Sequence, residues 1–168
     1  MPSTTITTEV IPAGTWTVDP VHSTIGFQVT DTTDLFSSIN GRFTQFEGRI
    51  EGGEQPSLAG TIRVDSLRTD NDQRDAHLTS PDFLDTAQDP EIRFETTALE
   101  PLDAERFRAR GNLIVKGSPY EVELEGRIRG QGQGKAGDER VLIDASGTFD
   151  WGSTAVEITA AVSAVKEA

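Results

Sequence analysis

The stretch that decides the fold is Glu105–Arg129, which reads ERFRARGNLIVKGSPYEVELEGRIR. On both sides of Gly117, apolar or small residues alternate with charged or polar ones. A period of two places the two kinds of residue on opposite faces of a β-strand. The stretch therefore predicts two strands, each with one face buried and the other in water.

A two-residue loop at Gly117-Ser118 is expected to join these two strands as a hairpin. In that register Lys116 lies opposite Pro119, and inward residues lie opposite inward residues. Arg110 then faces Glu125 across the solvent side, which is a favourable pair of opposite charges. A slip of one residue would turn every aliphatic side chain to water, so this register keeps the hydrophobic face intact.

The same alternation recurs along the chain at spacings of about ten residues. It covers 24–30, 60–65, 91–99, 141–149 and 156–162 in addition to the hairpin. Roughly eight or nine short strands with one apolar face and short connections predict an antiparallel sheet that closes into a barrel or folds into a sandwich. Small inward residues such as Ala109, Gly126 and Gly147 ease the bends of closure and leave room inside, which favours the barrel.

One helical excursion is predicted, at about 70–86, where it can cover one end of the barrel. Asp70–Gln73 offers an N-cap with a glutamine three residues on, and Ser80-Pro81 restarts a short turn. We expect residues 1–13 to be a flexible N-terminal segment and 14–168 to form a single β-barrel domain.

Charge and composition exclude several classes of function. The net charge is −13, so the chain lacks the excess of cations that nucleic acid or an anionic membrane requires. Cysteine is absent and there are two histidines, which argues against thiol chemistry, a metal centre and a bound cofactor. No stretch is apolar enough to span a bilayer and no signal peptide is recognised, so a cytoplasmic location is expected. A homodimer is left open.

The inward-facing apolar residues fit either an ordinary packed core or a lined cavity, because an eight-stranded barrel is just wide enough for one ligand. If the barrel is hollow, the predicted wall consists of Ile25, Phe27, Val29, Phe43, Ile62, Phe94, Leu113 and Phe149. The predicted lid consists of Phe83, Leu84, Leu35 and Phe36.

Two polar residues of the helical excursion complete the predicted ligand site. Arg74 is a fork-shaped donor suited to an anionic head group, although a salt bridge to a neighbouring aspartate explains it equally well. His77 lies two residues after Asp75, and a lyase or isomerase could use His22 or His77 with that carboxylate. No activated nucleophile stands beside the pair, and a structural histidine is the plainer alternative.

Six separated motifs resemble the YceI family, lipocalin-like polyisoprenoid-binding proteins, over about residues 14–166. They are WTVDPxHSTIxF (16–27), GRFxxFxG (41–48), SLxTDNxxRDxHL (66–78), DFLD (82–85), DPEIRF (89–94) and GNLIVKG (111–117). The resemblance implies an extended, antiparallel, eight-stranded barrel whose tunnel holds a long isoprenoid or similar lipid, without catalytic activity. It also implies that His22 and the Arg74-Asp75-His77 cluster occupy recurrent motif positions.

The chain departs from the family pattern in two places. Thr30–Phe36 is acidic where relatives tend to carry a basic, histidine-containing segment, and the connection after Phe149 is short. The working hypothesis is a non-catalytic carrier that sequesters a hydrophobic small molecule. The alternatives are the lyase or isomerase above and an interaction module whose barrel is filled by its own side chains.

Overall fold

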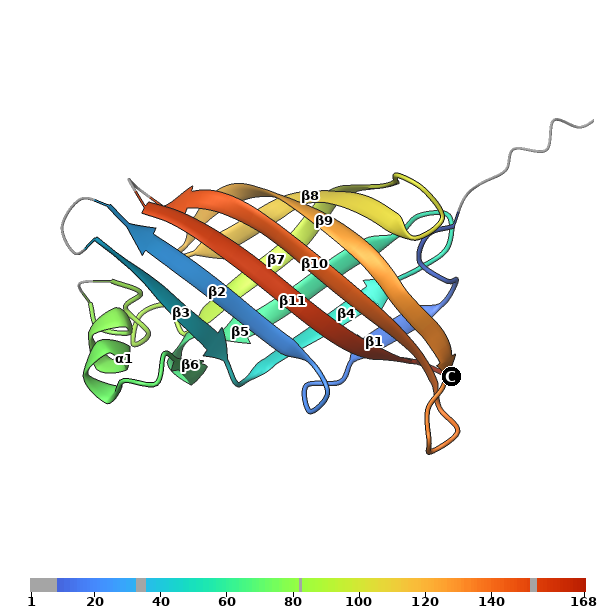
Figure 1. Cartoon of the computed structure of the whole chain (residues 1–168), viewed down its shortest axis with the longest axis horizontal. Helices are drawn as coiled ribbons and strands as arrows, with labels where there is room; N and C mark the ends of the chain where they lie inside the picture. The colour runs from blue at the N-terminus through green and yellow to red at the C-terminus, as the bar shows by residue number, and fades with distance from the viewer. Residues whose placement is uncertain (1–8, 33–35, 82, 152–153) are drawn as a thin grey trace, which may run out of the picture.

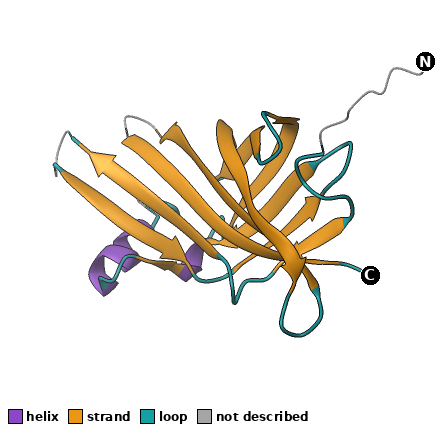
Figure 2. Cartoon of the chain, turned by 45° about the vertical axis from the view of Figure 1, so that its right-hand side comes forward, coloured by secondary structure: helices purple, strands orange, loops and turns teal. Residues whose placement is uncertain are grey.

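The computed structural model describes residues 9–32, 36–81, 83–151 and 154–168, and most of them lie in β-strands (Figure 2). The strands are β1 (Thr15–Val18), β2 (Thr24–Asp31), β3 (Ser37–Phe43), β4 (Phe46–Glu51), β5 (Ser57–Arg63), β6 (Leu67–Arg68), β7 (Glu91–Pro101), β8 (Arg106–Val115), β9 (Ser118–Gln133), β10 (Glu139–Trp151) and β11 (Thr154–Lys166). A single turn of 3-10 helix spans Val64–Ser66, and α1 spans Asp72–Leu78.

Eight of these strands close a ring, which confirms the predicted antiparallel barrel. The order around the ring is β1-β4-β5-β7-β8-β9-β10-β11, and β1 pairs again with β11 to close it (Figure 1). Every pairing in the ring is antiparallel. The alternating hydrophobic face is therefore buried inside a closed wall, as the short connections and period of two predicted.

A second layer of pairing lengthens the barrel at one end. The C-terminal part of β11 pairs with β1, and its Ala155–Ala161 part pairs with β2. β1 and β2 therefore follow one another along the same edge of β11. β3 continues from β2, and the two-residue strand β6 pairs with its last residues. The 3-10 turn, β6 and α1 all lie at this end (Figure 1), which we call the α1 end.

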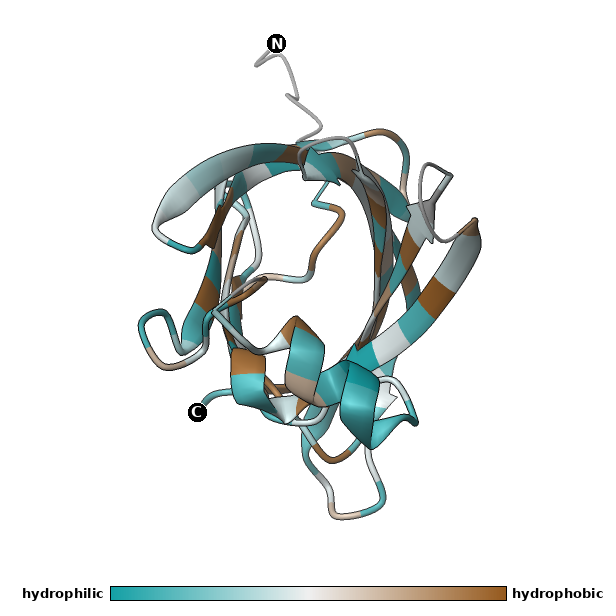
Figure 3. Ribbon diagram, turned by 90° about the vertical axis from the view of Figure 1, so that its left-hand side faces the viewer, coloured by the Kyte–Doolittle hydropathy of each residue, from teal (hydrophilic) through white to brown (hydrophobic). Residues whose placement is uncertain are grey.

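The predicted helical excursion is confirmed as α1 followed by a series of turns. The side chain of Asn71 caps the helix by accepting a hydrogen bond from the backbone N–H of Arg74 at 2.9 Å. Asp70, just before the cap, has a φ of 65° and makes the sharp entry into the helix. Figure 3 looks along the barrel from the α1 end and shows the helix lying across one side of its rim.

The predicted register of the β8–β9 hairpin is wrong by two residues. The two-residue loop is Lys116-Gly117, and Val115 pairs with Ser118. Both loop residues have positive φ, 52° and 75°, which is the twist that a two-residue hairpin loop favours. Inward residues still lie opposite inward residues, because a shift of two residues keeps every side chain on the same face.

The exposed face of the hairpin explains why this register is preferred. Arg108 pairs with Glu125 and Arg110 pairs with Glu123. The predicted register placed Arg108 near Arg127 instead, which brings like charges together. In the observed register Arg127 lies opposite Arg106, where Glu105 and Asp103 neutralise the two arginines. The guanidinium of Arg108 lies 2.9 Å from Glu123, diagonally across the same pair of strands.

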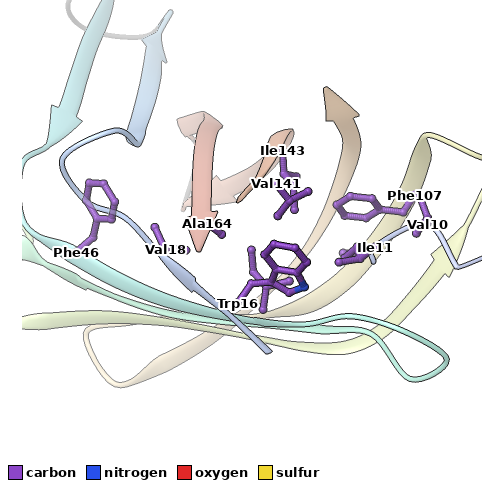
Figure 4. Close-up of a cluster of buried hydrophobic side chains, with 11 residues drawn as sticks. Val10, Ile11, Trp16, Val18, Phe46, Phe107, Val141, Ile143 and Ala164 are labelled. Atoms are coloured by element: carbon purple, nitrogen blue, oxygen red, sulfur yellow. The ribbon is translucent and has the colours of Figure 1, made fainter. Parts of the chain in front are cut away.

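The end of the barrel opposite α1, which we call the closed end, is filled by side chains (Figure 4). Trp16 and Phe107 are fully buried there, and the Trp16 indole N–H donates to the carbonyl oxygen of Pro12 at 2.9 Å. Val10 and Ile11 join them with 4% and 0% exposure. These two residues were predicted to belong to a flexible segment, and they are instead part of the core.

Hydrogen bonds as well as burial hold the N-terminal segment in place. Gly53 donates its N–H to the carbonyl oxygen of Ile11 at 3.0 Å, and Gly52 donates to Gly14 at 2.8 Å. The packed core therefore reaches back to Val10, and residues 1–8 lie outside the described residues.

Candidate binding cavity

A cavity of about 240 Å³ lies inside the barrel between the closed end and α1. Side chains from β2, β5, β7, β8, β10 and β11 form most of its wall, and Leu67 of β6 and Leu78 of α1 contribute at the α1 end. The residues facing it are overwhelmingly aliphatic or aromatic, so the space is dry and suited to hydrocarbon.

All eight residues predicted to form the wall line this cavity, and Leu84 of the predicted lid does so too. The period of two placed all of them except Phe43, which lies in β3, because each predicted strand turns one face inward. Their contact with a ligand stays a prediction.

Two aromatic pairs shape the wall near the α1 end. The rings of Phe27 and Phe43 lie 5.3 Å apart, and those of Tyr120 and Phe149 lie 5.7 Å apart. A methyl group at Gly41 would overlap the Phe27 ring, so that ring lies directly over the neighbouring strand. Phe27, Phe43 and Phe149 line the cavity, whereas Tyr120 does not.

Small residues account for the remaining space. Gly48 of β4 and Gly60 of β5 are cross-strand partners at inward positions, and Ala145 of β10 pairs with Ala160 of β11. All four line the cavity. A Cβ atom added at Gly60 would meet only backbone atoms of β4 within 4 Å, so nothing from the opposite wall fills the volume in front of it.

The predicted site left out many of the lining residues, and Leu67, Leu78 and Trp151 are instructive examples. Trp151 had a usable signal, because the inward phase of Val141–Phe149 continues to it when β10 is extended by two residues. Leu67 and Leu78 lie outside the regular strands that the periodicity described, so no alternation pointed to them.

Arg74 and His77 do not line the cavity. The Arg74 guanidinium is turned back onto Thr69, donating from Nε to the hydroxyl oxygen at 2.9 Å and from Nη2 to the carbonyl oxygen at 2.7 Å. The His77 ring packs edge-on against Phe83, with 4.7 Å between ring centroids. The predicted role of both residues in holding a head group finds no support in this geometry.

The rest of the predicted lid is also displaced from the cavity. Phe83 packs on His77 and does not line the space. Phe36 is 77% exposed and does not line it either, whereas Leu35 lies outside the described residues. Loop residues such as these follow no period, so a strand pattern could not place them.

The histidine–Asp75 pair is absent from the described structure. Asp75 accepts hydrogen bonds from the backbone N–H and the hydroxyl of Thr69, which ties α1 to the preceding segment. His22 pairs instead with Asp19, with 2.7 Å between Nδ1 and Oδ2. Neither histidine faces the cavity, so the dyad that the enzymatic alternative required is not assembled.

Asp19 is the centre of a charged cluster near the closed end. Its Oδ2 atom forms an ion pair with Nη1 of Arg140 at 2.9 Å. Nη2 of Arg140 lies 2.9 Å from Oδ2 of Asp138. The hydrogen bonds from His22 and then Arg140 lower the pKa of the Asp19 carboxyl well below its usual range. This cluster fastens the β1–β2 connection to β10 and lies apart from the cavity-lining residues.

Within the described ranges, no three histidine, aspartate or glutamate side chains gather in a way that could hold a metal ion. In the same part of the chain, none of the helices has the length and hydrophobicity needed to cross a bilayer.

Curated relatives agree with the motifs in the sequence. The chain is 32% identical over 130 residues to a UPF0312 protein of Enterobacter sp. (strain 638) and 31% identical over 130 residues to protein YceI of Escherichia coli O157:H7. Each match covers 75% of this chain and 66% of the relative. The chain thus spans about two thirds of the length of these relatives.

Solved structures show the same fold. A Campylobacter jejuni YceI protein aligns with a TM-score of 0.71 at 23% identity, covering 83% of this chain and 91% of that one. BcnA of Burkholderia cenocepacia aligns with a TM-score of 0.72 at 16% identity over 87% and 98%. A polyisoprenoid-binding domain from Saccharophagus degradans aligns with a TM-score of 0.62 at 14% identity over 90% and 98%.

A family model for the YceI-like domain matches residues 16–166, which include every strand of the barrel except the first residue of β1. With the curated relatives and the shared fold, this match makes the chain a member of the YceI-like family.

Proposed function

We propose that the barrel binds an apolar small molecule, an isoprenoid or similar lipid, without transforming it chemically. The observation that carries the proposal is the dry cavity of about 240 Å³ in the α1 half of the barrel. An empty void of this size lowers the stability of the fold, because the side chains that line it lose packing contacts. A hydrocarbon guest restores those contacts.

The relatives support the chemical class of the guest. The Saccharophagus degradans domain that shares this fold is described as polyisoprenoid-binding. The energetics are also adequate, since burial of ten methylene equivalents contributes roughly 8 kcal/mol before the cost of association. That total approaches micromolar affinity.

The absence of catalysis is part of the proposal. Three residues were candidates for a lyase or isomerase. The Asp75 carboxylate accepts a hydrogen bond from the backbone N–H of Thr69, and the His22 ring is hydrogen-bonded to Asp19. The His77 ring packs on Phe83 outside the cavity. A carrier needs no such groups, because apolar burial alone supplies its binding energy. A cytoplasmic location and a homodimer stay predictions.

Uptake of an uncharged fluorescent probe with a short apolar tail, combined with native mass spectrometry of the purified chain, tests the proposal. Gly60→Leu places a side chain in the open volume, and we expect the probe affinity to fall by roughly tenfold or more. Ala59→Leu is the matched control, because Ala59 is the adjacent, exposed residue of the same strand and its side chain faces outward, so that the cavity meets only its backbone.

The control should bind the probe as the unaltered chain does. Equal binding by both variants would show that the probe occupies some other place. Failure of the unaltered chain to take up the probe, together with the absence of bound lipid in repeated preparations, would overturn the proposed function.

A further inference from the structure

We infer that the guest is short and uncharged, with about ten carbon atoms enclosed, and that the closed end of the barrel sets this limit. The inference rests on the proposed function and deepens it. It also departs from the long-chain ligand that the family resemblance implied.

The floor of the cavity is the first step. Val18, Ile50 and Ile143 belong to the buried cluster of the closed end and also line the cavity. Behind them lie Trp16 and Phe107, both with 0% exposure and neither lining the cavity. Figure 4 shows Trp16, Ile11, Phe107 and Val141 gathered at this end. A hydrocarbon chain entering from the α1 end therefore meets packed side chains partway along the barrel.

The size of the remaining space is the second step. A cavity of about 150 Å³ accommodates benzene, which has six carbon atoms, so each carbon needs about 25 Å³. At that rate 240 Å³ holds roughly ten carbons. A chain of forty carbons would leave most of its length in water or would require the closed end to unpack.

The chemistry of the lining is the third step. Among the described lining residues only Glu47 and Arg49 carry charge. Both are exposed and occupy the outward phase of β4, so the cavity meets their backbone beside Gly48. No cationic side chain in the described lining is directed at a bound anion, and the net charge of −13 disfavours a diphosphate further. A guest whose head group is uncharged and lies at the α1 end is therefore compatible with this lining and with the net charge of the chain.

A chain-length series tests the inference. Neutral prenols of 5, 10, 15 and 20 carbons compete with the fluorescent probe, and geranyl diphosphate is added as the charged counterpart of the ten-carbon member. Each enclosed methylene raises affinity about fourfold, so the five carbons added between 5 and 10 should gain up to about a thousandfold. Steps beyond 10 carbons should gain less than about threefold, and the diphosphate should bind at least about tenfold more weakly than the alcohol.

A variant of the floor sharpens the test. Ile143→Ala removes a side chain that separates the cavity from the closed end. The affinity for prenols should then keep rising with chain length up to about 15 carbons. Leu142→Ala is its control, because Leu142 is the next residue of β10 and is 49% exposed. If Ile143→Ala does not fold, Gly60→Leu tests the limit in the opposite direction, because it shortens the open space. In that variant, affinity should stop rising below 10 carbons.

The outcomes are distinguishable. Affinity that keeps rising by tenfold per step through 20 carbons, or equal binding of the diphosphate, overturns this inference and leaves the carrier function standing. If no prenol displaces the probe and the probe itself does not bind, the proposed function fails as well.

Discussion

The two halves of the barrel share one wall and differ in what fills it. At the closed end, Trp16 and Phe107 pack in one buried cluster with residues from outside the regular strands, Val10 and Ile11. In the α1 half, the inward positions include Ala145 and Ala160, which are cross-strand partners, and about 240 Å³ is open. The same alternation of apolar and polar residues therefore encodes a solid core and a hollow one.

The comparison shows that the period of a strand decides which side chains point inward but not whether they meet. Closure of eight strands leaves an interior that is just wide enough to be either filled or hollow. The closed end is filled because an N-terminal segment folds into it and large side chains face one another. The other half stays open because small residues stand where large ones would be needed to fill it.

The largest expected effect comes from one substitution made in both halves. Phe107→Ala should lower the free energy of unfolding by about 3–5 kcal/mol, because its buried ring leaves a cavity. Phe94→Ala should cost only about 1–2 kcal/mol, because that ring already borders empty space. Chemical denaturation of the two variants measures the difference, and equal losses would contradict the distinction between the halves.

A smaller effect, opposite in sign between the halves, is expected along β11. Ala164 is fully buried at the closed end, so Ala164→Val should overpack it and cost about 1–3 kcal/mol. Ala160 faces the cavity, so Ala160→Val should stabilise the chain by about 1 kcal/mol and weaken probe binding. Because both changes are Ala→Val in one strand, strand propensity cancels. Destabilisation by both, measured by thermal unfolding, would mean that the α1 half is already packed.

The smallest effect concerns pH and the closed end. The pKa of Asp19 is lowered by His22 and then Arg140, and the pKa of Asp103 in the β7–β8 loop is lowered to about 2, first by the backbone N–H of Glu105. A lowered pKa gives stability that is present above the unfolded value near 4 and is lost as pH falls through the folded value. Stability should therefore decline between about pH 4 and pH 2.

Asp19→Asn should be less stable than the unaltered chain at pH 7 and should lose less stability on acidification. Unfolding curves at a series of pH values compare the two, while Asp144→Asn tests a carboxylate paired on the outside of β9 and β10. Parallel pH profiles for the unaltered chain and Asp19→Asn would refute the role of the cluster.

Most of the wall was predictable from the sequence, because all its residues except Phe43 lie in strands that the period of two predicts. Phe94, Leu113 and Phe149 needed no more than that phase. The hairpin register was not predictable to the residue, because registers two apart bury the same face. The turn conformation of Lys116-Gly117 and the charge pairs of Arg108 and Arg110 decided between them.

The contents of the barrel were not predictable in the same way. Val10 and Ile11 lie in a short segment without periodicity, and only the folded barrel provides the closed end that buries them. Arg74 looked like a ligand-binding cation because its chemistry suits anions, but Thr69 occupies its donors in the fold. Such contacts join residues whose relation is set by tertiary packing, and no local pattern describes it.

Methyl NMR during titration with a neutral ten-carbon prenol tests the central claim most directly. The account predicts that methyl signals of Leu113, Val156 and Ile158, which face the cavity, shift on binding. Signals of Val10, Ile11 and Val141 at the closed end should stay in place. Shifts of equal size in both sets, or shifts confined to the closed end, would contradict the division of the barrel into a packed half and a binding half.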